Sequence, residues 1–120
     1  MVSENLRSVV GAHYGLRDWL GQRVTAVIIT VYTILLLGIL LWNGRFDYAT
    51  WRALFAGGAF RAATFVFAVA VLYHAWVGVR NILMDYIKPA GVRLVLQVIV
   101  ICALIGYAGW TIQVLWGGPA

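Results

Sequence analysis

Residues 24–42, VTAVIITVYTILLLGILLW, decide the fold, because this stretch contains no charged side chain. A helix that crosses the roughly 30 Å hydrocarbon core of a bilayer needs about 20 mostly apolar residues. Two further runs have the same character: Ala62–Val79, which can continue as helix to about Met84, and Leu94–Trp116. Backbone polar groups in lipid must be satisfied within their own segment. The sequence therefore predicts an all-α membrane protein with three transmembrane helices, over residues 24–42, 62–84 and 94–116.

The composition agrees with lipid as the solvent. Apolar residues make up 63% of the 120 residues and charged residues 11%, against about 45–50% and about 25% in soluble domains. So few charges cannot coat a small soluble protein, which excludes an ordinary soluble enzyme and a disordered chain. The single cysteine, Cys102, excludes a disulfide framework and a multi-cysteine metal site. The length predicts one membrane-anchor domain over residues 1–120.

Positive charge predicts the orientation. The side that holds the N-terminus and the loop between the second and third spans carries six basic residues, and the opposite side carries three. The six are Arg7, Arg17, Arg23, Arg80, Lys88 and Arg93, and the three are Arg45, Arg52 and Arg61. Because cytoplasmic loops carry the excess of Lys and Arg, we expect a cytoplasmic N-terminus and a periplasmic C-terminus.

The loop between the first two spans, residues 43–61, contains several large apolar side chains. One interpretation is a short helix lying in the membrane interface. The other is a packed loop with Gly57–Gly58 as a hinge, and we expect a mixture of the two.

His74 is the principal candidate for chemistry, because it lies 12 residues into the second span. A polar side chain there is costly and usually faces the protein interior. Three interpretations remain open: a neutral histidine bonded to a neighbouring helix, a proton relay, or an axial ligand of haem iron. The small residues Ala75 and Gly78 favour haem, because they let a flat macrocycle approach the helix.

The histidine count limits how haem could be held. The chain has two histidines, and His13 precedes the first span. Met84 is ten residues further along the same helix as His74, or about 15 Å away. A second axial histidine would therefore come from another chain, which predicts a partner membrane subunit and makes this chain half of a two-subunit helical bundle.

A second candidate cluster is Asp85–Tyr86, which precedes Lys88–Pro89. Pro89 disfavours helix at Lys88, so we expect the second span to end there, at the membrane boundary. A carboxylate and a phenol at that level could bind and protonate a quinone. The alternative is that both are ordinary boundary residues.

Arg23 opens the first span. Its guanidinium fork matches a carboxylate, so it could bind a haem propionate. The alternatives are an anchor for lipid headgroups and a topology signal.

These residues resemble a known family. His74-Ala75-Trp76-Val77-Gly78, followed by Asp85-Tyr86-Ile87-Lys88-Pro89, is similar to a motif of the small hydrophobic membrane anchor of bacterial succinate dehydrogenase. That anchor is the second of two cytochrome b subunits, often called the D subunit or the cytochrome b556 small anchor. The resemblance extends to Met1-Val2-Ser3, Arg23-Val24-Thr25-Ala26 and Arg93-Leu94-Val95-Leu96-Gln97, and so covers nearly the whole chain.

The resemblance implies partners, cofactors and residue roles. Family members lie in the inner membrane with a flavoprotein subunit, an iron–sulfur subunit and a second three-helix anchor. Succinate is oxidised on the flavin, and electrons pass through the iron–sulfur clusters to ubiquinone. Haem b lies between the two anchors with one histidine ligand from each. The iron ligand of the family falls on His74, its quinone-binding tyrosine on Tyr86 beside Asp85, and its haem-propionate arginine on Arg23. Some members carry an uncharged residue at the position of Arg80, whose role stays open.

Three other functions compete with a haem- and quinone-binding anchor, which by itself performs no complete reaction. A fumarate reductase-type anchor without haem is one, although His74 argues against it. A small transporter or channel subunit could use His74 and Asp85 as a proton path. The third is a purely structural membrane scaffold. A b-type haem band in the reduced optical spectrum would support the haem-binding anchor alone.

Overall fold

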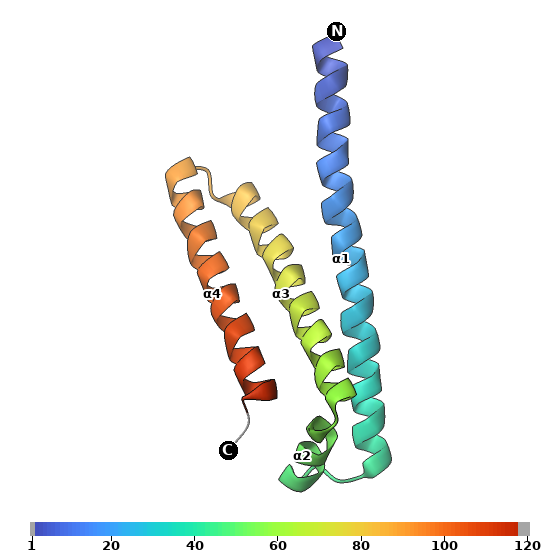
Figure 1. The fold of residues 1–120 in the computed structure, drawn as a ribbon. Helices are drawn as coiled ribbons and strands as arrows, with labels where there is room; N and C mark the ends of the chain where they lie inside the picture. Colours follow the sequence, from blue (N-terminus) through green and yellow to red (C-terminus); the bar gives the residue numbers. More distant parts are fainter. Residues whose placement is uncertain (1, 118–120) are drawn as a thin grey trace.

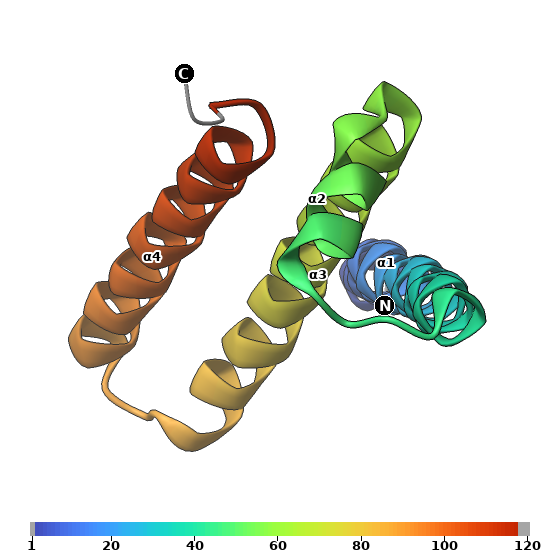
Figure 2. The ribbon, with the colours of Figure 1, turned by 90° about the horizontal axis from the view of Figure 1, so that it is seen from below.

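Three long helices and one short helix make up the fold (Figure 1). The computed structural model describes the backbone of residues 2–117 and the side chains of residues 15–117. Within that range there is no strand, and the helices are α1 (Val2–Asn43), α2 (Tyr48–Ala56), α3 (Gly58–Tyr86) and α4 (Ala90–Trp116). Two views at right angles show α3 between α1 and α4, with α2 at the end where α1 passes to α3 (Figures 1 and 2).

The prediction of three spans is confirmed. The helical segments long and apolar enough to cross a membrane are Gly15–Asn43, Gly58–Tyr86 and Ala90–Trp116. Each exceeds the predicted run, and a helix of 29 residues extends about 43 Å, so its ends reach beyond the roughly 30 Å hydrocarbon core. The polar segment before Val24 is also helical, because no proline interrupts its backbone hydrogen bonds before the span.

The connection from α1 to α3 contains the short helix expected within residues 43–61, namely α2, while its place in a membrane interface and the hinge at Gly57–Gly58 stay predictions. Gly44 ends α1 with a φ of 67°, a conformation that favours glycine, and its N–H donates to the carbonyl of Leu40 over 3.1 Å. Asp47 caps α2, since its carboxylate accepts a hydrogen bond of 2.9 Å from the Thr50 N–H. The hydrogen bonds from Thr50, first from its side chain and then from its backbone, lower the pKa of Asp47. Gly57 then separates α2 from α3.

The turn between α3 and α4 follows from Pro89. α3 ends at Tyr86, and Ile87 is extended, with φ −99° and ψ 106°. Pro89, with φ −65°, precedes the first residue of α4. The residue before a proline is disfavoured in helix, so the predicted end of the second span near Lys88 is confirmed.

The described core lies between α1 and α3. Tyr32 of α1 is 7% exposed, stacks on Phe67 of α3 with ring centroids 4.3 Å apart, and shares a 2.6 Å hydrogen bond with the Thr64 hydroxyl. Ala70 and Val77 of α3 are also buried, at 4% and 1% exposed. These contacts fix α1 against α3 in an antiparallel register.

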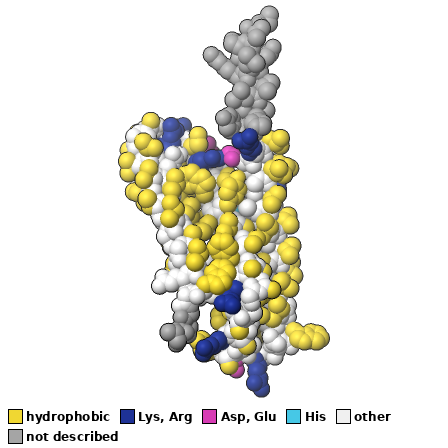
Figure 3. Space-filling model, in the orientation of Figure 1, with side chains coloured by type: hydrophobic (Ala, Val, Ile, Leu, Met, Phe, Trp, Pro, Cys, Tyr) yellow, Lys and Arg dark blue, Asp and Glu magenta, His cyan; other side chains and the backbone are white. Residues whose placement is uncertain are grey.

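The remaining apolar surface is open. No residue of α4 is buried, and large apolar side chains are exposed along α1, α3 and α4. Figure 3 shows hydrophobic side chains over the middle of the molecule and basic side chains toward its two ends. This arrangement suits a protein whose middle contacts lipid and other membrane helices, and whose ends contact headgroups.

Candidate functional site

The strongest candidate site lies where His74 of α3 meets α1. The Nδ1 atom of His74 is 3.1 Å from the hydroxyl oxygen of Thr25. Thr25 is 8% exposed, and its hydroxyl donates to the Gly21 carbonyl over 2.7 Å, with the Gln22 carbonyl at 3.2 Å. His74 itself is partly exposed, and no described side chain hydrogen-bonds its Nε2 atom. One ring nitrogen is thus engaged within the chain, and the other is available.

Close packing holds this contact in place. A Cβ atom added at Gly21 would lie 2.5 Å from the Tyr73 hydroxyl oxygen, so a larger residue at this crossing of α1 and α3 would force the tyrosine ring to shift. Val77, one turn beyond His74, is 1% exposed. At Gly78 an added Cβ would come no closer than 3.9 Å to the Gln22 side chain. A side chain at Gly78 would therefore make ordinary contact with α1, and the haem pocket expected beside His74 stays a prediction.

Arg80, whose role the sequence analysis left open, has a partner within the chain. Its guanidinium forms an ion pair with the carboxylate of Asp18, which joins α3 to α1 beyond the His74 contact. The Nε atom of Arg80 and the side-chain oxygen of Gln22 are buried without a hydrogen-bond partner among the described residues. The structure thus shows that Arg80 connects α3 to α1 through Asp18.

A spacing in the sequence could have revealed this interface. Asp18, Thr25 and Tyr32 follow one another at intervals of seven residues along α1, and seven residues at about 100° each return to nearly the same face of a helix. Their partners on α3, namely Arg80, His74 and Thr64, occur in reverse order, as the antiparallel register requires.

The other predicted site residues are separate from this contact. Asp85 and Tyr86 lie at the end of α3, where both are exposed, Tyr86 at 78%. They follow His74 by 11 and 12 residues on the same helix, or about 16–18 Å along its axis. His74 and the Asp85–Tyr86 pair therefore lie at two different depths along α3.

Arg23 does not approach His74 within this chain. Its guanidinium carbon lies 5.4 Å from the centre of the Trp19 ring, in a cation–π contact, and the residue is exposed. Two residues along a helix differ by about 200°, so Arg23 lies on nearly the opposite side of α1 from Thr25. The side chain of His13 is not among those that the structure describes.

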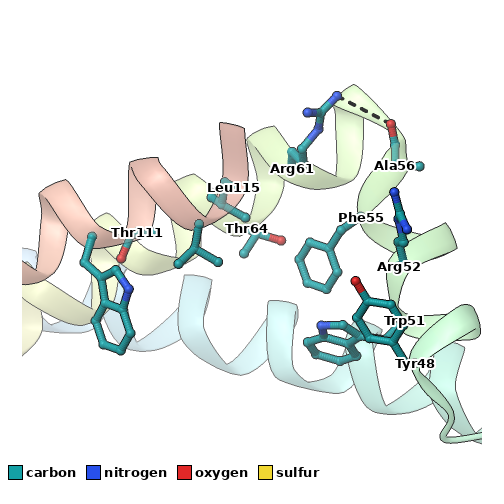
Figure 4. A pocket seen from close by; sticks show the side chains of 11 residues that line it. Tyr48, Trp51, Arg52, Phe55, Ala56, Arg61, Thr64, Thr111 and Leu115 are labelled. Carbon is teal, nitrogen blue, oxygen red and sulfur yellow. Dashed lines mark hydrogen bonds between the residues drawn. The ribbon is translucent and has the colours of Figure 1, made fainter. Parts of the chain in front are cut away.

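A cavity lies away from these residues, at the α2 end of the molecule (Figure 4). Its volume is about 770 Å³, and aromatic and arginine side chains from α2 and the start of α3 face the end of α4 across it. Its lining residues are Tyr48, Trp51, Arg52, Phe55, Ala56, Arg61, Thr64, Trp110, Thr111, Val114 and Leu115. The sequence analysis did not find this cavity, and it contains none of the predicted site residues.

No cluster of three or more His, Cys, Asp or Glu side chains that could hold a bare metal ion occurs among the described residues. His74 is a single imidazole in an apolar helix. A single imidazole can serve as one axial ligand of an iron atom whose other ligands come from a macrocycle and from another chain.

The chain is similar to known membrane subunits. The family described as "Succinate dehydrogenase/Fumarate reductase transmembrane subunit" matches residues 3–108. A curated relative from Coxiella burnetii, named "Succinate dehydrogenase hydrophobic membrane anchor subunit", is 36% identical over 102 residues. That alignment covers 85% of this chain and 89% of the relative.

The Asp18–Arg80 ion pair leads to a prediction on stability. The two side chains are 37% and 28% exposed, so the pair lies between a surface and a buried ion pair. We expect Asp18→Asn and Arg80→Gln each to destabilise the protein, and the double variant to lose less than the sum. The coupling should be about 1 kcal/mol and should fall with added salt. Unfolding of the purified protein in detergent measures it. Arg45→Gln is the control, since Arg45 is an exposed arginine, and strictly additive losses would contradict the pairing.

Proposed function

The chain belongs to the family of succinate dehydrogenase/fumarate reductase transmembrane subunits, and from this premise we propose that it binds haem b with a second anchor subunit and helps to form a ubiquinone-reduction site. The family and the three candidate spans make it a multi-pass membrane anchor subunit of succinate dehydrogenase. Its partners in the proposal are the second anchor, an iron–sulfur subunit and a flavoprotein subunit, in the bacterial inner membrane.

The observation that carries the haem proposal is the Thr25–His74 contact. It engages Nδ1 of His74 within the chain and leaves Nε2 available on a partly exposed ring. Histidines that bind metal usually make such a second hydrogen bond through their other nitrogen. His74 would therefore be one axial ligand through Nε2, and a bound haem would supply one-electron redox chemistry at that point.

The chain offers His74 but no second ligand near it among the described residues. Met84 is ten residues further along α3, about 15 Å away. The second axial ligand would therefore be a histidine of the other anchor subunit. The wholly unburied α4 and the exposed apolar faces of α1 and α3 offer large surfaces for that subunit to cover, so the three helices would form half of a two-subunit bundle.

Arg23 is the proposed partner of a haem propionate. Its Cα lies about 3 Å along α1 from that of Thr25, at a similar depth to His74 but on nearly the opposite side of α1, so the propionate would reach it around that helix. The guanidinium is exposed and has the aromatic ring of Trp19 beneath it. A planar guanidinium suits bidentate binding of a carboxylate.

The quinone site is proposed at the end of α3. Reduction of a quinone consumes two electrons and two protons, so its carbonyl oxygens need hydrogen-bond donors close to water. The exposed Tyr86 hydroxyl would donate a hydrogen bond to one carbonyl oxygen while remaining uncharged, because the pKa of a phenol is usually about 10. Asp85 beside it would relay a proton from the aqueous side. The helix end before Pro89 supports this location at the membrane boundary.

The orientation is proposed from the charge difference. The N-terminus and the α3–α4 turn lie at the same end of the molecule (Figure 1), and that side carries six of the nine basic residues. We expect that side to be cytoplasmic. A periplasmic reporter fused after Ala120 should be active, and one inserted at Lys88 should be inactive. The reverse pattern would contradict the proposed orientation.

His74→Leu tests the haem proposal. Removing the imidazole takes away one axial ligand, so we expect the purified complex to lose its low-spin b-type spectrum. Gln113→Leu, which replaces an exposed polar residue near the end of α4, is the control and should keep the spectrum. An unchanged low-spin spectrum in His74→Leu would contradict ligation by His74. A wild-type complex without b-type haem would favour the haem-free fumarate reductase-type anchor instead.

Tyr86→Phe tests the quinone proposal, since it keeps the ring and removes only the hydroxyl. Loss of one hydrogen bond costs about 0.5–1.5 kcal/mol, so quinone reduction by the complex should slow by several-fold to about tenfold. Succinate oxidation with a soluble dye should persist, because the flavin lies in another subunit. Tyr107→Phe removes an exposed phenol from α4 and is the matched control. Unchanged quinone kinetics in Tyr86→Phe would exclude the proposed hydrogen bond.

A further inference from the structure

The Thr25 hydroxyl has three polar neighbours but a single proton. Its oxygen lies 2.7 Å from the Gly21 carbonyl, 3.2 Å from the Gln22 carbonyl and 3.1 Å from Nδ1 of His74. Carbonyl oxygens only accept hydrogen bonds, whereas a neutral imidazole nitrogen donates or accepts according to its tautomer. The direction of the hydrogen bond between Thr25 and His74 therefore follows from where the hydroxyl proton goes.

The carbonyls select the direction of that hydrogen bond. If the hydroxyl donated to Nδ1, its lone pairs would face the Gly21 carbonyl oxygen at 2.7 Å without a proton between the two oxygens. If the hydroxyl donates to Gly21, as threonines in helices commonly do four residues back, its lone pair faces Nδ1 instead. Nδ1 must then carry the imidazole proton and donate it to Thr25.

Packing around the pair limits how Thr25 can move. Thr25 is 8% exposed and branched at Cβ, so its side chain has few rotamers inside a helix. Tyr73 lies beside Gly21, and Val77, three residues after His74, is 1% exposed. The hydroxyl is thus held in position against Nδ1.

We infer that Thr25 is a positioning residue that holds His74 in the tautomer with the proton on Nδ1, so that Nε2 presents its lone pair for iron. This inference rests on the proposed haem function. The Thr25 hydroxyl would accept the hydrogen bond from Nδ1 and so orient His74 before haem binds. A neutral hydroxyl suits an apolar span, where a carboxylate in that role would add a buried charge.

The hydrogen bond also has an electronic consequence. An imidazole that donates through Nδ1 becomes a more basic ligand at Nε2. A more basic ligand stabilises ferric iron relative to ferrous iron and so lowers the reduction potential of the haem. Thr25 should therefore hold the potential below the value that the same His74 ligand would give without the hydroxyl.

Thr25→Val tests the inference in the assembled complex, because valine keeps the branched shape and removes the hydroxyl. We expect the haem midpoint potential to rise, by about 59 mV for each tenfold loss of ferric preference. Haem affinity should fall by about 10- to 100-fold, and the g values of the low-spin ferric signal should shift. Thr25→Ser restores a hydroxyl and should bring all three properties back toward the wild type.

Thr30→Val is the matched control on the same helix. The Thr30 hydroxyl donates to the Ala26 carbonyl over 2.8 Å, in the same backbone pattern, but the residue is exposed and has no described contact with His74. The complex that carries Thr30→Val should have the haem potential and the g values of the wild type. If Thr25→Val prevents assembly, Thr25→Ala removes the same hydroxyl without adding atoms and carries the same expectation.

The experiments distinguish failure of the proposed ligation by His74 from failure of the role inferred for Thr25. If His74→Leu keeps the wild-type low-spin spectrum, the proposed ligation fails and the inference fails with it. If His74→Leu loses that spectrum but Thr25→Val or Thr25→Ala keeps the wild-type potential and g values, ligation stands and the inference is overturned. A loss of stability in the Thr25 variants without a change in potential would likewise overturn it, because it would leave Thr25 a purely structural role.

Discussion

The hydrogen bond between Thr25 and His74 joins two side chains 49 positions apart in the sequence, across the interface between α1 and α3. On one side of it, Tyr32 packs against Phe67 and bonds to Thr64. On the other side, Asp18 pairs with Arg80. In an apolar environment each of these polar groups is costly without its partner. The three polar contacts therefore select one register of α1 against α3, and the position of His74 depends on that register.

Away from this interface the chain buries very little of itself. No residue of α2 or α4 is buried, and the described core consists of a few side chains. Lipid tails are as apolar as leucine, so helices in a membrane gain little by burying apolar surface alone. A chain of this kind reaches its final packing by association, which agrees with its family of anchor subunits that belong to a larger complex.

α3 carries the two proposed activities at two depths. His74 lies within its apolar length beside α1, whereas Tyr86 is its last residue and is exposed. The separation suits the chemistry proposed for each residue. Electron transfer through a haem favours a dry and rigid ligand, while protonation of a quinone requires water, which is present only at the membrane boundary.

The sequence by itself determined the three spans, the turn at Pro89 and the candidacy of His74, Asp85 and Tyr86. Those features are local: the bilayer fixes the length of an apolar run, and a proline limits the backbone of the residue before it. The sequence analysis did not predict the helical start of α1 before Val24 or the bounds of α2, because polar segments follow no such length rule.

Only the tertiary structure decided which side chains meet. Apolar side chains are spread around α3, so the periodicity of that helix does not show which of its faces packs against α1. The roles of Thr25 and of Arg80, and the cavity between α2 and α4, depend on contacts between residues far apart in the chain. A local pattern specifies that a helix forms, whereas its rotation and register against a neighbour are set by the polar partners and small residues that the neighbour presents.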